Sequence, residues 1–385
     1  MPHARCYLPV FLLLVCMLGQ LSSARAVERL LVDVDGRTKK LSGKVVIEYA
    51  DGSMLLETDE GALWPIMADT ILDRVSDSEP MVPLDQEQLG QRLLQEMGPG
   101  FQLHESKHYV VVFNTTSTYA IWCSTLLEKL QRGFLYFWKK KGAKIHEPKV
   151  PLAVLIFKNK TTYLKHAEAE LGASAGNAIG YYSFQTNRIV MYDLTGSQAF
   201  RREYSRRGSK KDITALLQTR EAEPLVATII HEATHQIAFN SGLQKRYADN
   251  PVWLSEGMAV YFETPNLSSR RLWSGTDKVN YSRWDRFRKN VRNDKAANLK
   301  TLIADDSRLR HPRTAVDGYA EAWAWNYFLI KWHPKEYTKY LETLAAKPLL
   351  TKDKPATRLA DFQQHFGKDL KKLEDEFYRR MSKLR

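Results

Sequence analysis

The stretch HEATHQIAFNSGLQKRYADNPVWLSEGMAVYFE, residues 231–263, contains two short patterns that decide how the chain is interpreted. In the first pattern, His231 and His235 are four residues apart, and Glu232 follows the first histidine. Glu223-Pro224 ahead of them favours a helix that starts there and continues to about Phe239. Residues four apart lie on one face of a helix, so both imidazoles are expected to point at the same ion. Glu232 is then placed to reach a water on that ion.

The second pattern, WLSEGMAVYFE, places Glu256 with 20 residues between it and His235. A hydrolytic zinc site takes three protein ligands and leaves a fourth position for water. A helix–loop–helix can return a carboxylate to the ion across that distance. The sequence therefore predicts one zinc ion per chain, bound by His231, His235 and Glu256, with Glu232 as the general base. The alternative is an ordinary amphipathic helix whose histidines have this spacing by chance.

Together the two patterns resemble those of the gluzincin metallopeptidases, whose third ligand lies in a WLNEGFA-like helix at nearly this separation. The residues that match that helix are Trp253, Leu254, Glu256, Gly257 and Ala259, while Ser255 and Met258 replace asparagine and phenylalanine. The tail FGKDLKKLEDEFYRRM is similar to the final helix of an uncharacterised family of exported bacterial proteins of unknown function that share this core. The resemblance is expected to cover residues 101–385, and it implies a zinc metallopeptidase with a protein or peptide substrate.

Within that resemblance, the departures and the remaining candidate residues refine the expected chemistry. Zinc aminopeptidases carry a GxMEN segment whose glutamate holds the substrate amine, but the comparable SAGNAIGYYSFQ has no acidic residue, which favours an endopeptidase. Tyr319 lies 63 residues after Glu256, a distance at which aminopeptidase-type gluzincins place an oxyanion-binding tyrosine; a packing tyrosine is the alternative. Glu263 is interpreted as orienting a ligand histidine or as a surface residue at a helix end. His311 is a second candidate donor, and residues 187–193 form the strand expected to pair with substrate.

The order of the predicted elements indicates an α+β fold with a small N-terminal antiparallel β-domain at residues 27–78. Short β-like runs alternate there with the turn signals ADG and DEG. A linker and a short helix, residues 79–100, precede a domain of residues 101–385. That domain begins with strands and helices in alternation, and it turns helical after Phe200. The expected architecture is therefore a gluzincin-like (thermolysin-like) catalytic domain with a mixed sheet and a mainly helical C-terminal half.

The first 26 residues have the pattern of a secretory signal peptide. Arg5 precedes the apolar run from Tyr7 to Leu18, and Ala24-Arg25-Ala26 is typical of a cleavage site. An uncleaved anchor is the alternative, although the run is short for a membrane span. Cleavage after about Ala26 predicts a secreted or periplasmic protein with no transmembrane segment in the mature chain. Of the three cysteines it would keep one, Cys123, which excludes an internal disulfide.

The formal net charge of +13 becomes +11 when Arg5 and Arg25 are removed with the signal peptide. Basic runs such as FWKKKGAK and SRWDRFRKNVRNDK are usually solvated faces, and in an exported protein they indicate affinity for an anionic envelope polymer. Acidic residues separate the runs and no nucleic-acid motif accompanies them, so nucleic acid is not expected as a partner. Two other functions stay open: a non-catalytic envelope-binding protein with a structural zinc, and a zinc hydrolase of cell-wall amide bonds.

Overall fold

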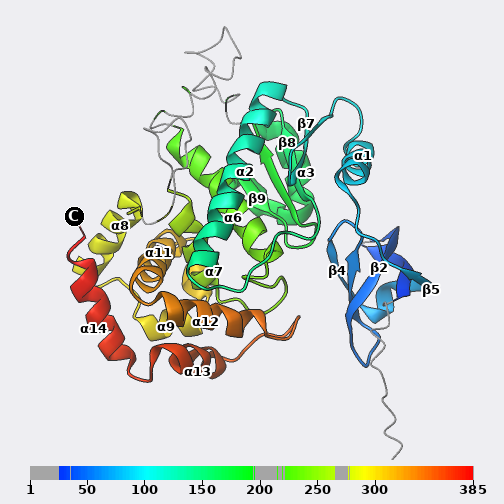
Figure 1. Ribbon diagram of the computed structural model, residues 1–385. Coiled ribbons are helices and arrows are strands. Elements are labelled where there is room, and N and C mark those ends of the chain that lie inside the picture. The colour runs from blue at the N-terminus through cyan, green and yellow to red at the C-terminus, as the bar shows by residue number, and fades with distance from the viewer. Residues whose placement is uncertain are drawn as a thin grey trace, which may run out of the picture.

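The computed structural model describes residues 26–34, 36–193, 222–264 and 278–384, together with Thr195, Ala215, Thr219 and Thr276 (Figure 1). The fold is α+β, as predicted from the sequence: an N-terminal antiparallel sheet, then a mixed sheet, then a helical C-terminal half. The predicted signal peptide lies outside the described residues, apart from Ala26 at its end.

The N-terminal sheet is antiparallel throughout, with the strand order β4-β3-β2-β1-β5. Its strands are β1 (Ala26–Val34), β2 (Arg37–Glu48), β3 (Met54–Thr58), β4 (Leu63–Ile66) and β5 (Ile71–Pro80), with the 3-10 turn η1 (Ala68–Thr70) before β5. One face buries Leu30, Val32, Leu56 and Ile66. The sheet runs two residues further than the predicted 27–78, because Pro80 at the end of β5 pairs with Ala26. The short helix expected in the linker is α1 (Gln86–Met97).

The second sheet has the order β6-β7-β8-β10-β9 and is mixed, because β7, β8 and β10 are parallel while β6 and β9 are antiparallel to their neighbours. Its strands are β6 (Gln102–Glu105), β7 (Tyr109–Phe113), β8 (Leu152–Phe157), β9 (Gly180–Tyr182) and β10 (Arg188–Tyr192). The helices between them are α2 (Ser117–Lys140) and α3 (Lys160–Leu171), with η2 (Gly172–Asn177) before β9.

Both faces of this sheet are covered by helices, which explains why its central strands read as continuous apolar runs. Val111 and Val154 face the large cluster that includes α2 and the later helix α6 (Glu223–Asn240). Val112 and Leu155, one residue further along each strand, face α1 and α3 on the other side. Side chains alternate between the two faces of a strand, so each strand contributes to both cores.

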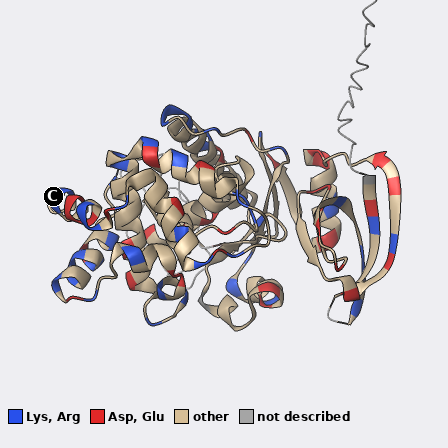
Figure 2. Cartoon of the chain, turned by 90° about the horizontal axis from the view of Figure 1, so that it is seen from below, with Lys and Arg blue, Asp and Glu red and all other residues tan. Residues whose placement is uncertain are grey.

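The C-terminal half of the described chain is helical. Its helices are α7 (Val252–Phe262), α8 (Tyr281–Arg292), α9 (Leu299–Ala304), α10 (Ser307–Arg310), α11 (Ala315–Trp332), α12 (Pro334–Ala345), α13 (Pro355–Phe366) and α14 (Leu370–Met381). Figure 2 shows Lys and Arg on many of these helices and on the N-terminal sheet, with acidic residues among them. Among the described helices, none has the length and apolar character needed to span a membrane.

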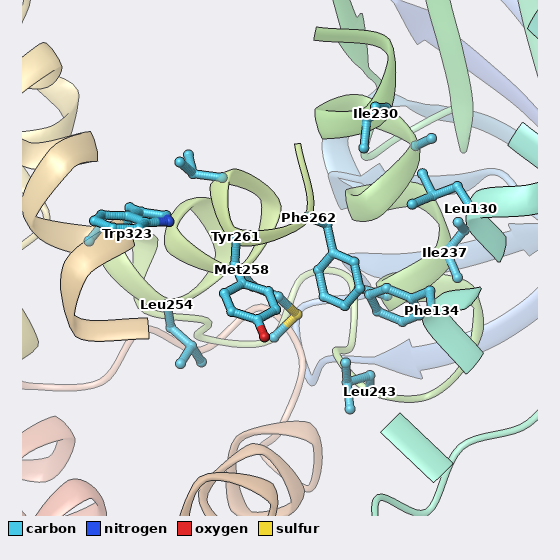
Figure 3. Packing of buried hydrophobic residues seen from close by; sticks show 14 of the residues in the cluster. Leu130, Phe134, Ile230, Ile237, Leu243, Leu254, Met258, Tyr261, Phe262 and Trp323 are labelled. Carbon is cyan, nitrogen blue, oxygen red and sulfur yellow. The ribbon is translucent and has the colours of Figure 1, made fainter. Parts of the chain in front are cut away.

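Helix α7 lies in the middle of the large core and is buried along most of its length. Figure 3 shows its side chains Met258 and Phe262 directed towards α6 and α2, where Phe134 packs 4.9 Å from the Phe262 ring. On its other side α7 contacts α11 and the indole of Trp323. Apart from Ser255 and Glu256, the sequence of α7 is apolar, because this helix packs against neighbours over most of its surface.

At Gly257, α7 and α11 approach each other closely. A Cβ atom there would lie 2.0 Å from Nδ2 of Asn326 and 2.5 Å from the carbonyl oxygen of Ala322. The same amide nitrogen donates hydrogen bonds to the carbonyl oxygens of Trp253 and Ala322, so it has no free direction in which to move.

We expect Gly257→Ala to lower the free energy of unfolding by about 1–3 kcal/mol, because it overpacks this contact and breaks a buried hydrogen bond. Chemical denaturation measures the change. Gly176→Ala is the control, since a Cβ atom at Gly176 meets nothing within 4 Å. Equal stability of the two variants would contradict the close approach of α7 and α11.

The N-terminal sheet is docked against the second sheet by a charge cluster around the buried Arg188 and by a small apolar contact. Arg188 of β10 reaches Glu60, in the turn after β3, at 2.8 Å and Glu96 of α1 at 2.7 Å. The main chain continues the contact, because the Leu63 N–H donates to the carbonyl oxygen of Gln185. Leu55 and Leu63 of the sheet also pack on Leu349. The N-terminal sheet is therefore fixed close to the β9–β10 turn.

Candidate metal site

Helix α6 carries the first candidate pattern. Pro224 lies in its first turn, where the missing N–H of proline removes no helix hydrogen bond. His231 and His235 lie one turn apart on the same face, with their Nε2 atoms 3.2 Å apart. Their neighbours Ile230 and Ile237 are buried on the opposite side of the helix. The apolar face of α6 therefore fixes the direction in which both imidazoles point.

Helix α7 brings Glu256 to the two histidines. Its Oε2 lies 3.1 Å from Nε2 of His231 and 3.6 Å from Nε2 of His235. The connection between α6 and α7 is held by side chains: Gln244 donates to the hydroxyl of Ser255, and Asp306 accepts from the N–H of Val252. The described chain thus brings together all three residues that the sequence predicts as ligands.

The arrangement fits a single tetrahedral metal ion. Ligand atoms at about 2.0–2.1 Å from a tetrahedral ion are about 3.3 Å from one another. The three observed separations, from 3.1 to 3.6 Å, are close to that value. Two imidazoles and one carboxylate, which could hold an ion here, leave one tetrahedral position free.

Glu263 lies behind this cluster, at the end of α7. Its Oε2 is 2.9 Å from Nδ1 of His231, and the residue is only 7% exposed. The sequence allowed two interpretations of Glu263: orientation of a ligand histidine, or a surface position at a helix end. The second interpretation is therefore wrong. A carboxylate on Nδ1 fixes the orientation of the ring and leaves Nε2 for a metal ion. Arg283 and Asn280 of the next helix approach the other oxygen of Glu263 at 3.4 Å.

The charges of the cluster are strongly coupled. Burial lowers the pKa of His231, but the carboxylates of Glu256 and Glu263 outweigh it, and the pKa lies well above its usual range. Burial raises the pKa of Glu256, yet the two histidines hold it far below the ordinary value. The raised pKa of His231 and the lowered pKa of Glu256 both favour a charged histidine next to charged carboxylates. A metal ion bound there would displace a proton from His231, so the affinity of the site for metal would rise with pH.

Glu232 lines the same cavity as His231 and is hydrogen-bonded to the second sheet. Its Oε2 accepts a hydrogen bond of 2.8 Å from the backbone N–H of Tyr182 in β9. Burial is the main cause of the raised pKa of Glu232, and the neighbouring histidines oppose it. A carboxylate with a raised pKa is a stronger proton acceptor than an exposed one.

The strand that borders the site is β9, and the prediction for residues 187–193 is wrong. Strand β10 lies between β8 and β9, so both of its edges are already paired. Strand β9 is the edge of the sheet, and its Tyr182 N–H is directed at Glu232 rather than at β10. Sequence alternation identified two strands here but not which of them lies outermost.

A network of amides ties the β9–β10 turn to α6. Asn187 has a positive φ of 62°, and its side chain exchanges two hydrogen bonds with Asn240. Gln236 of α6 donates to the carbonyl oxygens of Asn187 and Ala153, at 2.9 and 3.0 Å. The Tyr182 hydroxyl donates to the same Asn187 side chain. These links hold β9 at a fixed distance from Glu232.

Tyr319 lies beside the three candidate metal ligands. It sits in the second turn of α11 rather than at the helix start, and its ring centroid is 6.4 Å from that of His231. Burial and the nearby carboxylate of Glu256 raise the pKa of Tyr319, so its phenol is protonated at neutral pH. Arg283 lies over the Tyr319 ring, at 5.8 Å from the centroid. The structure thus brings Tyr319 to the candidate site, while its chemical role stays a prediction.

His311 does not join the site. It is exposed, and its Nδ1 accepts the backbone N–H of Arg313. A cavity of about 570 Å³ does reach His231 and Glu232; Ile179, Thr228, Glu263, Asn280 and Arg283 also line it. The sequence had given no reason to single out Tyr182 or Arg283, because a backbone N–H has no residue signature and arginines are frequent in this chain.

Comparison with known families found a match to a family described as a protein of unknown function (DUF1570) over residues 225–351. The matched range starts inside α6 and ends just after the bridge between Ala248 and Leu349. It includes His231, Glu232, His235, Glu256 and Tyr319. No curated protein matches the chain.

Proposed function

We propose that the protein is an exported zinc metallohydrolase of the gluzincin type and, more specifically, an endopeptidase. The observation that carries the proposal is the convergence of His231, His235 and Glu256 at tetrahedral spacing, with Glu232 next to His231 in α6 and in the wall of the same cavity. This donor set is the one that hydrolytic zinc sites use. A zinc ion bound there would supply Lewis-acid polarisation of a carbonyl and a water whose pKa is lowered to about 7.

In this proposal each residue has one task. Glu232 takes the proton of the attacking water and returns it to the leaving amine, for which its buried position and raised pKa suit it. Tyr319 donates its phenolic proton in a hydrogen bond to the developing oxyanion. Glu263 keeps the ring of His231 in place from behind.

In the part of the chain that the structure describes, the outer edge of β9 has no strand partner, and it is the element against which an extended peptide would lie. An edge strand offers main-chain N–H and C=O groups that can pair with a substrate strand. The segment GASAGNAIGYYSFQTN, from η2 to the β9–β10 turn, contains no carboxylate that could hold a free amino terminus. This supports cleavage inside a chain over removal of single amino-terminal residues.

The decisive experiment is a cleavage assay on peptides derived from a whole proteome, with zinc-loaded protein and with protein treated with a chelator. The proposal expects zinc-dependent internal cuts that return when zinc is restored. A parallel digest of cell-wall material tests the amide-hydrolase alternative directly. Zinc binding without cleavage of either material would favour the non-catalytic alternative and overturn the proposal.

We expect Tyr319→Phe to lower kcat about 10²–10³-fold, as for loss of one oxyanion donor. The change removes one hydroxyl and keeps the ring that packs near His231. Zinc content and melting temperature are expected to stay at wild-type values, while KM changes little. Tyr327→Phe is the control, because that tyrosine is buried lower on the same helix and its hydroxyl accepts from Lys331. An unchanged kcat for Tyr319→Phe would make Tyr319 a packing residue.

A further inference from the structure

A second cavity, of about 410 Å³, lies at the junction of the N-terminal sheet and the rest of the protein. We call it the junction cavity. The sheet contributes Val46, Glu57, Gly61 and Leu63, and the rest of the protein contributes His146, Lys149, Val150, Phe239, Asn240, Gly242, Gln244, Lys245, Arg246, Ala345 and Leu349. None of the metal-site residues lines it. It is therefore separate from the site described above.

The charge that dominates this cavity is the guanidinium of Arg246, which is only 8% exposed. It donates to the carbonyl oxygens of Gly61, at 2.6 Å, and Phe184, at 3.0 Å. No carboxylate among the described residues forms an ion pair with it. Main-chain carbonyls carry partial charges only, so a full positive charge is left in a poorly solvated place.

The other buried arginines of the described chain have carboxylate partners. Arg188, 5% exposed, contacts the carboxylates of Glu60 and Glu96. Arg358, 3% exposed, contacts those of Asp249 and Asp306. Each therefore has two carboxylates as partners. Arg246 is the exception. Arg358 also lines a cavity, of about 790 Å³, but its charge is balanced there by Asp249 and Asp306, whereas Arg246 lines the junction cavity without a carboxylate partner among the described residues.

The rest of the cavity wall supports an anionic occupant. Lys149 and Lys245 add two further positive charges at its wall. The acid among the lining residues, Glu57, is already paired with Lys44 at 2.7 Å. Apolar side chains of Val150, Phe239 and Leu349 line the remaining wall. The cavity thus combines a cationic group with an apolar surface.

We propose that the junction cavity binds a small organic oxyanion, a carboxylate or phosphate group on an apolar body. The oxyanion lies against Arg246 and Lys149 in charge-assisted hydrogen bonds. Its apolar body lies against Phe239, Val150 and Leu349. Such a ligand touches both the sheet and the helical part, so its binding strengthens the docking of the N-terminal sheet. The proposal does not depend on zinc or on hydrolysis.

The test is isothermal titration of the full chain with four probes: phenyl phosphate, benzoate, inorganic phosphate and neutral benzyl alcohol. We expect phenyl phosphate or benzoate to bind and to raise the melting temperature, inorganic phosphate to bind more weakly, and benzyl alcohol not to bind. The aromatic probe that binds more tightly shows whether the site prefers a phosphate or a carboxylate group. The titrations are repeated after treatment with a chelator, because an anion can also bind a metal ion at His231, His235 and Glu256.

Variants locate the binding. Lys149→Gln is expected to weaken binding of the aromatic anions about tenfold, by the loss of one charge-assisted contact. Arg246→Gln is expected to abolish binding, and Lys149 serves as the second variant because Arg246 also holds the Gly61 turn. Lys139→Gln, an exposed lysine of α2 outside the cavity, makes the same charge change as a control. Absence of binding, binding lost on chelation, or equal affinity of the two lysine variants would overturn the proposal.

Discussion

Glu232→Gln is expected to keep its metal ion and to lose hydrolysis by about 10²–10⁴-fold in kcat. Glutamine has the same shape as glutamate, and its side chain can still lie near the Tyr182 N–H that Glu232 contacts at 2.8 Å. It cannot accept the proton of an attacking water, so only the chemical step is affected. Metal analysis, the melting temperature and steady-state kinetics on one peptide substrate measure the three quantities together.

Glu223→Gln is the matched control for that variant. It makes the same chemical change on the same helix, at an exposed position on the wall of the cavity that reaches His231. Its activity is expected to stay within a few-fold of wild type, which would show that loss of negative charge near the site is not the cause. Activity of Glu232→Gln close to that of the control would rule out Glu232 as the general base.

Glu256→Ala is expected to weaken zinc binding by more than about 100-fold. Loss of a carboxylate behind a ligand typically costs about 10–100-fold in affinity, and loss of a ligand atom costs more. Competition with a chromophoric chelator measures the affinity. Removal of Glu256 also takes one of the two carboxylates away from His231, so its pKa falls towards the ordinary value.

Glu263→Gln gives a graded comparison for the same measurement. It keeps a hydrogen-bond acceptor 2.9 Å from Nδ1 of His231 and removes only the charge. Its affinity for zinc is expected to fall within the range of about 10–100-fold. If Glu256→Ala binds zinc as tightly as wild type, or more tightly than Glu263→Gln, the third ligand has been assigned wrongly.

Most of the candidate site could be predicted from the local spacing of residues in the sequence. His231 and His235 share a helical face because of their separation alone, and the length of the connection was sufficient to return Glu256 to them. The continuous apolar runs in β7 and β8 likewise indicated a buried sheet. Strand β6 was missed, since Gln102–Glu105 is short and mostly polar. The fold class could therefore be predicted from the sequence.

Features that depend on contacts between distant parts of the chain could not be predicted from the sequence. Whether β9 or β10 forms the sheet edge depends on the pairing of β10 with β8, which is separated from it by more than thirty residues. The burial of Glu263 depends on α8, and the contact with Glu232 is made by a backbone N–H that every non-proline residue has. Arg246 has the same local sequence signature as any exposed arginine, so its missing carboxylate partner becomes visible only in three dimensions.

The candidate site has two walls, and the amide network around Asn187 connects the elements of only one of them rigidly. One wall consists of α6 and β9, which are joined by the Asn187–Asn240 pair and by Gln236. The other wall carries Arg283 and Tyr319 on α8 and α11. The Tyr319 ring lies near the ring of His231 on α6, and Arg283 reaches Glu263 at the end of α7, whose carboxylate contacts His231. If the site widens to admit a bulky chain, we expect α8 and the first turns of α11 to move rather than α6 and β9. Specificity for large substrates would then depend on the stiffness of α8 and α11, at a distance from the atoms that react.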